Sequence, residues 1–537
     1  MTGDALYRAI LADPGDDTPR LVCADWLEEN GRAEEAEFIR IECRLAAIAP
    51  DDPDYSDLLD RQEELRLWLR ANVPGPKLKL PAGLKVESGA DWWRNTSRGF
   101  PRFLEYEGYD GTGQKSVRAL AAALAKAFAK LPTRWLVLRF VTVEQLAELL
   151  RQPAVAGLDR LTIVLGATDD PQDEACELLA RCSYLRNLRE LVLTFPVGDA
   201  GAAALARSDH FGRLERLQCH HAMWCTPAAI RSLGAADWFR GLRALGLSEL
   251  DDTAFEELCR LDPSPHLHTL ELDESSFPTA SWRVFARSRT FPHLARLANG
   301  TELAAGQAEA LAGATHFRPI DLNLSTCAIG NGGAQALASA PWLGSLRRLT
   351  LSFNLLTARG FAAIAGCRKL SGLKYLDLSY NTPGVRGLRA LADNPALRGL
   401  TTLLLTSNEG HNRGVTPTHF QALLTKLDMP NLRHLGLYFR GIGSRAARLL
   451  AGEKFASLAR LDLGFCNLTD AAVRALVAAP ALQNLIELRL PGNDLASGVR
   501  PLADSRTMPR LASAVLGLNR IDQPLVRKLR RRPGVIA

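Results

Sequence analysis

Residues 346–356, "LRRLTLSFNLL", place leucines at a strict spacing while the residues between them vary. The stretch fits the pattern L-x-x-L-x-L-x-x-N, which starts at Leu346 and ends at Asn354. The pattern returns in "LKYLDLSYN", residues 373–381, and in "LTTLLLTSN", residues 400–408, so that its first leucine moves by 27 residues each time. A fixed period of this length predicts a solenoid, in which each copy packs mainly on its two neighbours.

Weaker copies extend the array in both directions. We expect about sixteen copies over residues 98–537, spaced by 25 to 33 residues and atypical at both ends, because a terminal copy lacks one neighbour. The copies start at Phe100, Thr133, Leu158, Leu188, Leu214, Leu242, Leu267, Leu294, Pro319, Leu346, Leu373, Leu400, Leu432, Leu458, Leu485 and Leu511.

Each copy is expected to form a strand, a turn and a helix. Leu349 and Leu351 lie two residues apart and share the buried face of the strand, whereas Arg348 and Thr350 share the other, open face. A helical stretch such as residues 469–480, "TDAAVRALVAAP", follows the turn. Strands need about 4.8 Å of spacing and helices about 10 Å, so the stack must curve. The predicted fold class is therefore an α/β solenoid, a horseshoe with a parallel sheet on the concave face and helices on the convex face.

An asparagine ends the strand in several copies. Its amide both donates and accepts hydrogen bonds, so it can bond the turn backbone of the adjacent copy. Cys327 and Cys466 take the same position, where a thiol serves as a weak donor. We interpret these residues as structural and not as catalytic. The asparagine ladder comprises Asn354, Asn381, Asn408, Asn493 and Asn519.

With these features the pattern resembles leucine-rich repeats, and the long helical half of each copy is similar to the ribonuclease-inhibitor subclass. The resemblance covers about residues 98–537, and it departs from the pattern at Gly166, Pro196 and Ala222, which stand at the asparagine position. Because an enzyme inhibitor and GTPase-activating proteins use this subclass, the resemblance implies a protein partner and allows that partner to be an enzyme.

Residues 3–48 break the repeat and indicate three short helices. The order of "PRL", "ADWLEE" and "AEFIR" in this segment resembles the bacterial repeat-companion domain, a small module that accompanies repeat arrays and from which no activity can be transferred. We expect Trp26 and Phe38 to lie in a core, and Asp25 and Arg40 to bond locally. A docking site for a shared partner is the alternative.

The segment between these two regions is predicted to connect them. Residues 51–72 indicate an amphipathic helix, and the following proline- and glycine-rich stretch contains Trp92 and Trp93, which we expect to cover the first copy and not to bind a ligand. The predicted domains are residues 1–50, a helical repeat-companion domain; 51–97, a connecting helix and capping linker; and 98–537, the repeat array.

Composition favours a protein of the cytoplasm. The net charge of +6, from 65 basic and 59 acidic residues, is too dilute to indicate a nucleic-acid partner. The ten cysteines are scattered and indicate reduced thiols. The first residues, "MTGDALYRAILADPGDD", lack the features of a secretory signal, and no apolar run of about 18 residues predicts a membrane span.

No motif for phosphate binding, zinc proteolysis or paired metal-binding cysteines occurs, so we expect no enzyme activity, cofactor or metal. The stretch "CHHAMWC", residues 219–225, directs its potential ligands apart, which favours ordinary surface histidines over a zinc site. The basic stretch "VRKLRRRPGVIA", residues 526–537, favours a solvated face over a nucleic-acid contact.

The open face of the sheet remains as the candidate site. Aromatic side chains beside charged ones are typical of protein-binding hot spots, although aromatic residues before a turn could simply cover the strand edge. Our main hypothesis is a non-enzymatic scaffold that binds an unidentified protein there, expected as a monomer; the alternative is an inhibitor or regulator of an enzyme. The predicted partner-binding residues are Arg348, Phe353, Tyr375, Asp377, Tyr380, His434, Tyr438, Phe439, Arg460, Asp462 and Phe465.

Overall fold

The computed structural model of the 537-residue chain describes residues 3–50, 52–74, 79–81, 83–86, 96–97, 100–109, 117–166, 170–220, 225–300, 302–406, 415–438 and 442–536. Eighteen strands of this part belong to one mainly parallel sheet, and strands alternate with helices along the chain. The predicted α/β solenoid is therefore confirmed. The chain divides into two compact units: an N-terminal unit, Met1–Pro50, Gly75–Thr301 and Ala314–Phe317, and a C-terminal unit, Asp51–Pro74, Glu302–Gly313 and Arg318–Ala537.

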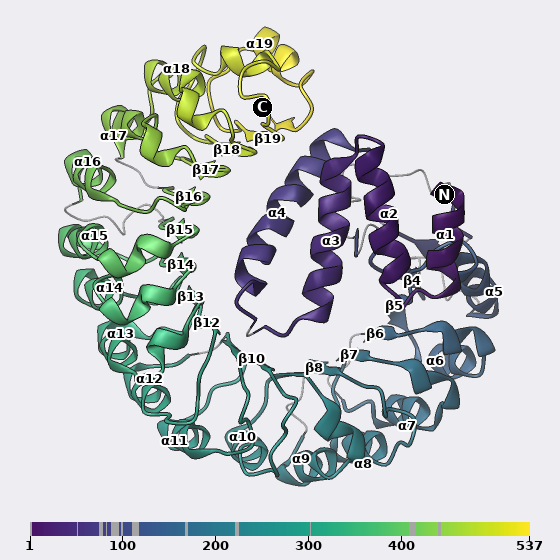
Figure 1. Ribbon diagram of the computed structural model, residues 1–537. Coiled ribbons are helices and arrows are strands. Elements are labelled where there is room, and N and C mark those ends of the chain that lie inside the picture. The colour runs from purple at the N-terminus through teal and green to yellow at the C-terminus, as the bar shows by residue number, and fades with distance from the viewer. Residues whose placement is uncertain are drawn as a thin grey trace. The chain divides into compact units, whose positions relative to one another are not determined.

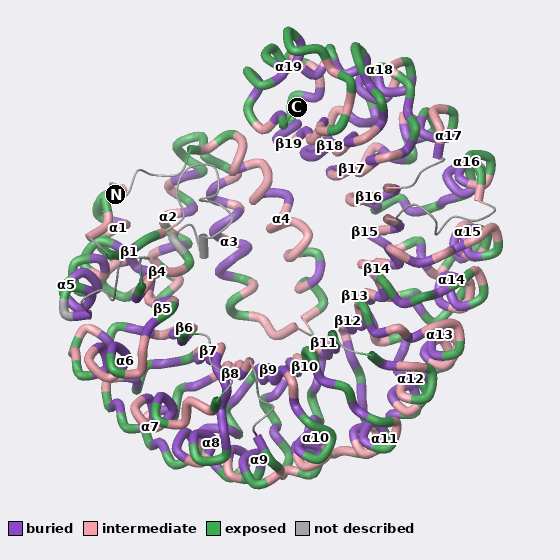
Figure 2. Tube along the Cα trace, turned by 180° about the vertical axis from the view of Figure 1, so that it is seen from behind, coloured by how far each residue is buried: buried purple, intermediate pink, exposed green. Residues whose placement is uncertain are grey.

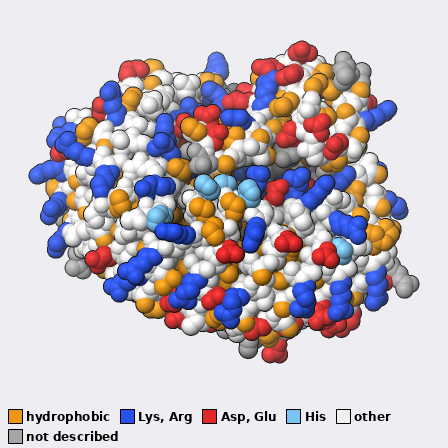
Figure 3. Space-filling model, turned by 60° about the horizontal axis from the view of Figure 1, so that its bottom comes forward, with side chains coloured by type: hydrophobic (Ala, Val, Ile, Leu, Met, Phe, Trp, Pro, Cys, Tyr) orange, Lys and Arg blue, Asp and Glu red, His pale blue; other side chains and the backbone are white. Residues whose placement is uncertain are grey.

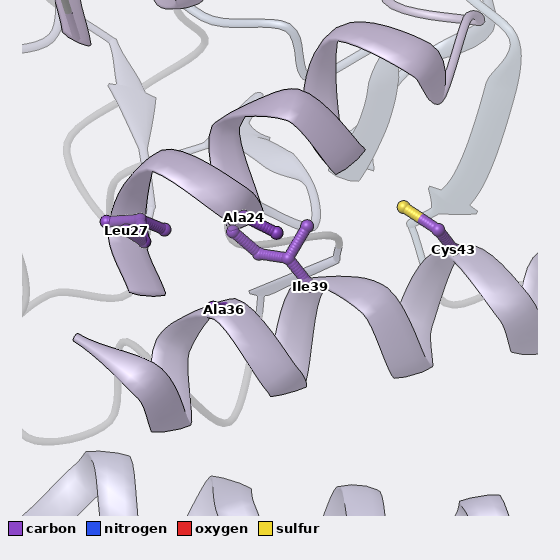
Figure 4. Close-up of a cluster of buried hydrophobic side chains, with 5 residues drawn as sticks. All are labelled: Ala24, Leu27, Ala36, Ile39 and Cys43. Atoms are coloured by element: carbon purple, nitrogen blue, oxygen red, sulfur yellow. The ribbon is translucent and has the colours of Figure 1, made fainter. Parts of the chain in front are cut away.

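Three helices open the N-terminal unit: α1 (Gly3–Ala12), α2 (Thr18–Glu29) and α3 (Ala33–Ala47). Helices α2 and α3 pack through small and aliphatic side chains (Figure 4). Phe38 is fully buried, whereas Trp26 is half-buried against this cluster. Arg40 donates to Asp25 at 2.7 Å and to Glu28 at 2.6 Å on the surface. The cluster consists of Ala24, Leu27, Ala36, Ile39 and Cys43.

The repeats of the N-terminal unit follow. Its strands are β1 (Leu84–Lys85), β4 (Leu104–Glu107), β5 (Trp135–Val141), β6 (Arg160–Leu165), β7 (Glu190–Thr194), β8 (Arg216–His220), β9 (Ala244–Ser248), β10 (Thr269–Asp273) and β11 (Arg296–Asn299), beside a two-stranded sheet of β2 (Thr96–Ser97) and β3 (Phe100–Pro101). Its repeat helices are α5 (Val117–Phe128), α6 (Val143–Leu150), α7 (Asp173–Arg181), α8 (Asp199–Ala206), α9 (Pro227–Gly234), α10 (Asp252–Leu258) and α11 (Thr279–Arg287).

The C-terminal unit has the more regular repeats. Its strands are β12 (Asp321–Asn323), β13 (Arg348–Thr350), β14 (Tyr375–Asp377), β15 (Thr402–Leu404), β16 (His434–Gly436), β17 (Arg460–Asp462), β18 (Glu487–Arg489), β19 (Ser513–Val515) and β20 (Val535–Ile536). Its helices are α4 (Tyr55–Asn72), α12 (Ala305–Ala312), α13 (Gly330–Ser339), α14 (Ala358–Ala365), α15 (Gly384–Ala392), α16 (Pro417–Lys426), α17 (Gly443–Leu449), α18 (Asp470–Ala478) and α19 (Gln523–Leu529).

The repeat spacing sets the register of this sheet. Leu349 pairs with Leu376, Leu376 with Leu403, and Leu403 with Leu435, all between parallel strands. These equivalent leucines are 0–1% exposed, and burial follows the strands and the helix sides that face them (Figure 2). Apolar burial of this kind is the main term that stabilises a solenoid, because each copy contributes a leucine layer that is covered by the next copy.

The first and last strands differ from prediction. Leu104 of β4 pairs with Leu136 of β5, so the first copy starts one residue after Phe100. The reason is that Leu104 and Tyr106 alternate into the core while Phe103 stays half-buried. Beyond the last predicted copy, β20 adds one further parallel strand to β19.

Candidate functional site

Helix α4 lies against the open face of the C-terminal unit, on the side of the sheet opposite helices α13–α18 (Figure 1). Its sequence favours a helix, since Leu, Arg, Glu and Gln dominate it and Val73 and Pro74 follow its last turn. Its side chains contact the beginnings of the seven copies that start at residues 346, 373, 400, 432, 458, 485 and 511. The chain therefore occupies part of its own open face.

The first half of α4 makes polar contacts. Asp60 accepts hydrogen bonds from Thr401 Oγ1 at 2.9 Å and Thr402 Oγ1 at 3.2 Å, and it lies 3.3 Å from Arg348 Nη1. Asp57 Oδ2 lies 3.8 Å from Lys374 Nζ. An acidic helix edge thus meets basic and hydroxyl side chains at the second and third positions of successive copies.

Glu64 is the central contact of this edge. Its side chain is 2% exposed and accepts two hydrogen bonds from Arg433, one from Nε at 2.6 Å and one from Nη2 of the same guanidinium. Arg61 of the same helix donates to it at 2.9 Å. The hydrogen bond to Glu64 raises the pKa of the Arg433 guanidinium. A bidentate pair around a buried carboxylate fixes both the position and the direction of the helix.

The second half of α4 makes apolar contacts. Leu67, Trp68 and Ala71 pack on a small cluster at the beginnings of β17, β18 and β19. The cluster consists of Ala459, Ile486 and Ala512, which are 2–3% exposed. The polar first half of α4 therefore specifies its position, and the apolar second half supplies buried surface.

The length of α4 matches the sheet that it crosses. Its 18 residues span about 27 Å at about 1.5 Å per residue, and the six intervals between seven parallel strands span about 29 Å at about 4.8 Å each. One helical turn thus advances by about one strand. The contacting residues, Asp57, Asp60, Glu64, Leu67 and Ala71, follow the three- and four-residue spacing of a single helix face.

Two predicted site residues lie under α4. Arg348 is 18% exposed, faces Asp60, and stacks its guanidinium 4.0 Å from the centre of the Tyr375 ring. Burial raises the pKa of Tyr375 to about 12. The phenol therefore stays protonated at neutral pH; Arg348 contacts the chain's own helix, and Tyr375 packs on Arg348.

The charged residues along the strands are bonded within the unit. Arg460 Nε donates to Glu487 at 3.0 Å, and Asp462 accepts from Arg489 Nε at 3.0 Å. Asp377 accepts from the Ser379 amide at 2.8 Å. Burial raises the pKa of both Asp377 and Asp462.

Burial also lowers the pKa of His434 well below its ordinary value, and the charges of Arg460 and Arg489 lower this pKa further. The folded chain therefore keeps His434 neutral at a pH at which the unfolded chain protonates it. The contribution of neutral His434 to the free energy of unfolding is therefore present above pH 6.5, the ordinary pKa of histidine in the unfolded chain, and decreases as the pH falls below this value. Between pH 7.5 and 5.5 the wild type should lose about 1.4 kcal/mol more of its unfolding free energy than His434→Gln, as measured by urea titration. Equal losses in the two proteins would contradict this assignment.

Four aromatic side chains lie beyond the other ends of the strands; we call Phe353, Tyr380, Tyr438 and Phe465 the aromatic row. The Phe353 and Tyr380 rings stack with centroids 3.8 Å apart and planes inclined by 12°. The Tyr438 and Phe465 rings lie 5.1 Å apart. Phe353 is 46% exposed and the other three are half-buried. Phe439, the remaining predicted aromatic, is outside the described residues.

The backbone of the row is strained. Phe353, Tyr380 and Phe465 have φ angles of 53–55°, in the left-handed region that bulky residues rarely adopt. The Phe353 amide donates to Ser379 O and the Phe465 amide to Pro491 O, which holds this conformation. Glycine makes room for the rings in neighbouring copies: a Cβ at residue 464 would lie 2.3 Å from the Tyr438 ring, and one at residue 492 would lie 2.7 Å from the Phe465 ring.

The asparagine ladder supports the turns beneath this row. The side-chain Nδ2 of Asn354 donates to Leu324 O at 2.6 Å in the preceding copy. The backbone N–H of Asn354 donates to Asn381 Oδ1 at 3.1 Å in the following copy. Asn493 donates to Leu463 O and accepts from the Cys466 amide, and Asn519 accepts from the Asn493 amide. Asn408 is outside the described residues.

The remaining sequence clusters take structural positions where they are described. Arg532 is 7% exposed, and its guanidinium donates to carbonyls that include Leu502 O and Thr507 O, so it closes the last turn and does not face solvent. Cys225 donates to Val197 O, and burial raises the pKa of its thiol to about 12. Among the described residues no group of three or more His, Cys, Asp or Glu side chains is placed to hold a metal.

Sequence reasoning did not identify the contacts of α4. A signal was present, because Lys374, Thr401 and Arg433 are polar residues at the second position of their copies, and Asp57, Asp60 and Glu64 follow one helix face. Neither pattern by itself shows that the two sets meet.

Comparison with known proteins agrees with the repeat architecture. A family model described as Leucine Rich repeat matches residues 321–338 and 456–477. No curated protein matches the sequence. Among solved structures, a chain of the yeast Rad7–Elc1 complex is 14% identical, with a TM-score of 0.43, over 73% of this chain and 92% of that chain. An internalin, InlF, from Listeria monocytogenes is 15% identical, with a TM-score of 0.37, over 79% of this chain and 93% of that chain.

The chain thus contains leucine-rich repeats, and its fold is an α/β leucine-rich-repeat solenoid. Within the described part of the chain, every helix is too short or too polar to cross a membrane.

Proposed function

We propose that the chain is a non-enzymatic scaffold that binds a partner protein on the open face of its C-terminal unit, at the aromatic row. The observation that carries the proposal is α4. The same sheet already holds the chain's own helix α4 at the beginnings of its strands, through ion pairs, hydrogen bonds and an apolar cluster. A face that binds one helix with a matched repeat is suited to bind a second protein segment beside it.

The strain in the aromatic row supports this proposal. Asparagine or glycine adopts a left-handed conformation at lower cost, yet three of the four residues of the row are phenylalanine or tyrosine in this conformation, as is Phe140 in the N-terminal unit. A strained conformation of this kind costs about 1–3 kcal/mol per residue. Aromatic side chains that are held at such a cost and left partly exposed suit anchors for a partner, and aromatic anchors dominate protein interfaces.

Replacing Phe353 and Tyr380 by asparagine tests the row. Asparagine relieves the backbone but loses the ring stack, so the unfolding free energy should change by no more than about 1 kcal/mol. Capture of the partner from an extract of the source cell, followed by mass spectrometry, should be lost. Leu518→Asn is the matched control, because Leu518 is left-handed and 77% exposed but lies outside the row. A partner captured equally by all three proteins would contradict the proposal.

We further propose that the repeats belong to the ribonuclease-inhibitor subclass and that α1–α3 form a repeat-companion domain of a bacterial protein. The alternation of strands with helices of 7 to 10 residues in the C-terminal unit supports the first assignment. The α2–α3 core and the bonds of Arg40 support the second. The described cysteines are all free, which favours the cytoplasm.

A further inference from the structure

A cleft of about 570 Å³ opens between helices α10 and α11 of the N-terminal unit. One wall is apolar and consists of Leu261, Ala280 and Val284. Arginines surround the cleft, and Ser288 and Thr290 complete its lining. The four arginines are Arg260, Arg283, Arg287 and Arg289.

Most of this positive charge is uncompensated. Arg260 lies 2.6 Å from Glu256, but none of Arg283, Arg287 and Arg289 forms an ion pair with any acidic side chain in the described parts of the chain. The sequence explains this, since no Asp or Glu occurs between Ser275 and Thr301.

The other outer helices of the unit show a different pattern. Basic and acidic side chains lie interspersed on the surface that Figure 3 displays. Arg231 of α9 lies 3.2 Å from Glu257 of α10, and Arg181 of α7 lies 3.1 Å from Glu177. Arg231 and Arg181 thus have acidic partners, whereas Arg283 and Arg287 of α11 form no ion pair within the described parts of the chain.

A favourable interaction with the helix dipole does not explain the positions of all three arginines. Arg287 ends α11, where a cation interacts favourably with the helix dipole, but Arg283 lies in the middle of the helix and Arg289 lies beyond it. Arg283 and Arg287 are four residues apart on one face, so their like charges repel. The carbonyl of Cys259 at the end of α10 accepts hydrogen bonds from Ser288 Oγ at 2.7 Å and Thr290 Oγ1 at 3.0 Å, so this carbonyl does not depend on an arginine as its donor.

We propose that this cleft binds a small organic phosphate. The planar guanidinium of arginine matches phosphate oxygens in bidentate geometry, and several guanidinium groups around one cleft would neutralise a doubly charged group. The volume lies within the range of about 300–1,000 Å³ that is typical of small-molecule sites. The apolar wall would contact the organic part of the ligand.

Isothermal titration calorimetry of the full chain with phenyl phosphate tests the proposal. We expect saturable binding with one site per chain, tighter than the binding of inorganic phosphate, which lacks an apolar part. R283Q and R287Q together should weaken binding at least about tenfold, because each removes a charge-assisted hydrogen-bond donor. R289Q should also weaken the binding of phenyl phosphate, and it leaves α11 unchanged because Arg289 lies outside that helix. R181Q on α7 is the matched control and should bind as the wild type does.

Four results would overturn the inference. The first is the absence of saturable binding of phenyl phosphate. The second is an affinity for phenyl phosphate that is the same in R283Q/R287Q, R289Q and the wild type, or that R181Q lowers as much as these variants do. The third is inorganic phosphate binding as tightly as phenyl phosphate, which would contradict the role of the apolar wall. The fourth is a phosphoserine peptide binding more tightly than either, which would replace a small ligand by a phosphorylated protein.

Discussion

Asn381→Ala is expected to lower the free energy of unfolding by about 3 kcal/mol, because the variant leaves several buried backbone groups without partners. Asn381 is 2% exposed. Its Nδ2 donates to Leu351 O at 2.8 Å and Leu378 O at 3.1 Å, and its Oδ1 accepts from the Asn354 and Leu356 amides. Urea titration followed by circular dichroism measures the loss.

Asn519→Ala is the matched control for this prediction. Asn519 makes the same kinds of bonds, to Leu490 O and from the Asn493 and Leu495 amides, but it is only half-buried. Water can replace some of these bonds, so the loss should be about half as large. If Asn381→Ala costs no more than Asn519→Ala, burial of the ladder does not set its contribution.

Arg433→Ala is also expected to cost about 3 kcal/mol, because the variant leaves the buried carboxylate of Glu64 with Arg61 as its remaining cationic partner among the described contacts. The matched control is Arg398→Ala. Arg398 pairs with Asp428 at 3.2 Å, but both side chains are more than half exposed, so its loss should stay below about 0.5 kcal/mol. Equal effects of the two substitutions would show that the α4 contact contributes no more than a surface ion pair.

The leucine spacing predicts most of the repeat array. From Thr133 to Leu511 the predicted copies have the register that the strand pairs show, because the fourth residue of each copy is buried at the same level of the sheet. Where that spacing is absent the prediction fails. The residues of β20, Val535–Ile536, lack the leucine pattern, so this strand could not be recognised.

The candidate site was predictable only in part. The side-chain direction of Arg348 follows from its position in the strand, but its partner Asp60 lies 288 residues away, and local periodicity contains no information on such a contact. The same holds for Arg433 and Glu64, which are 369 residues apart. Arg532 was interpreted with its neighbours as a solvated basic face because composition does not distinguish a side chain that reaches solvent from one that bonds buried carbonyls.

The stacking of the aromatic row has a similar explanation. The sequence shows that Phe353 and Tyr380 occupy equivalent positions, one period apart, and parallel pairing brings equivalent positions together. The left-handed backbone of both residues was not predictable, since left-handed positions usually carry glycine, asparagine or aspartate. The same conformation occurs at the equivalent residue of other copies, for example Thr326 and Leu518, so the stacked aromatic side chains, and not the backbone strain, distinguish the row.

Hydrogen exchange of the chain with and without its purified partner tests the central claim most directly. The account predicts slower exchange of the backbone amides around the aromatic row, at residues 352–354, 379–381 and 464–466, on addition of the partner. Helices α13–α18 on the other side of the sheet should exchange as before. Protection of those helices with no change around the aromatic row would contradict the claim that the partner binds the open face.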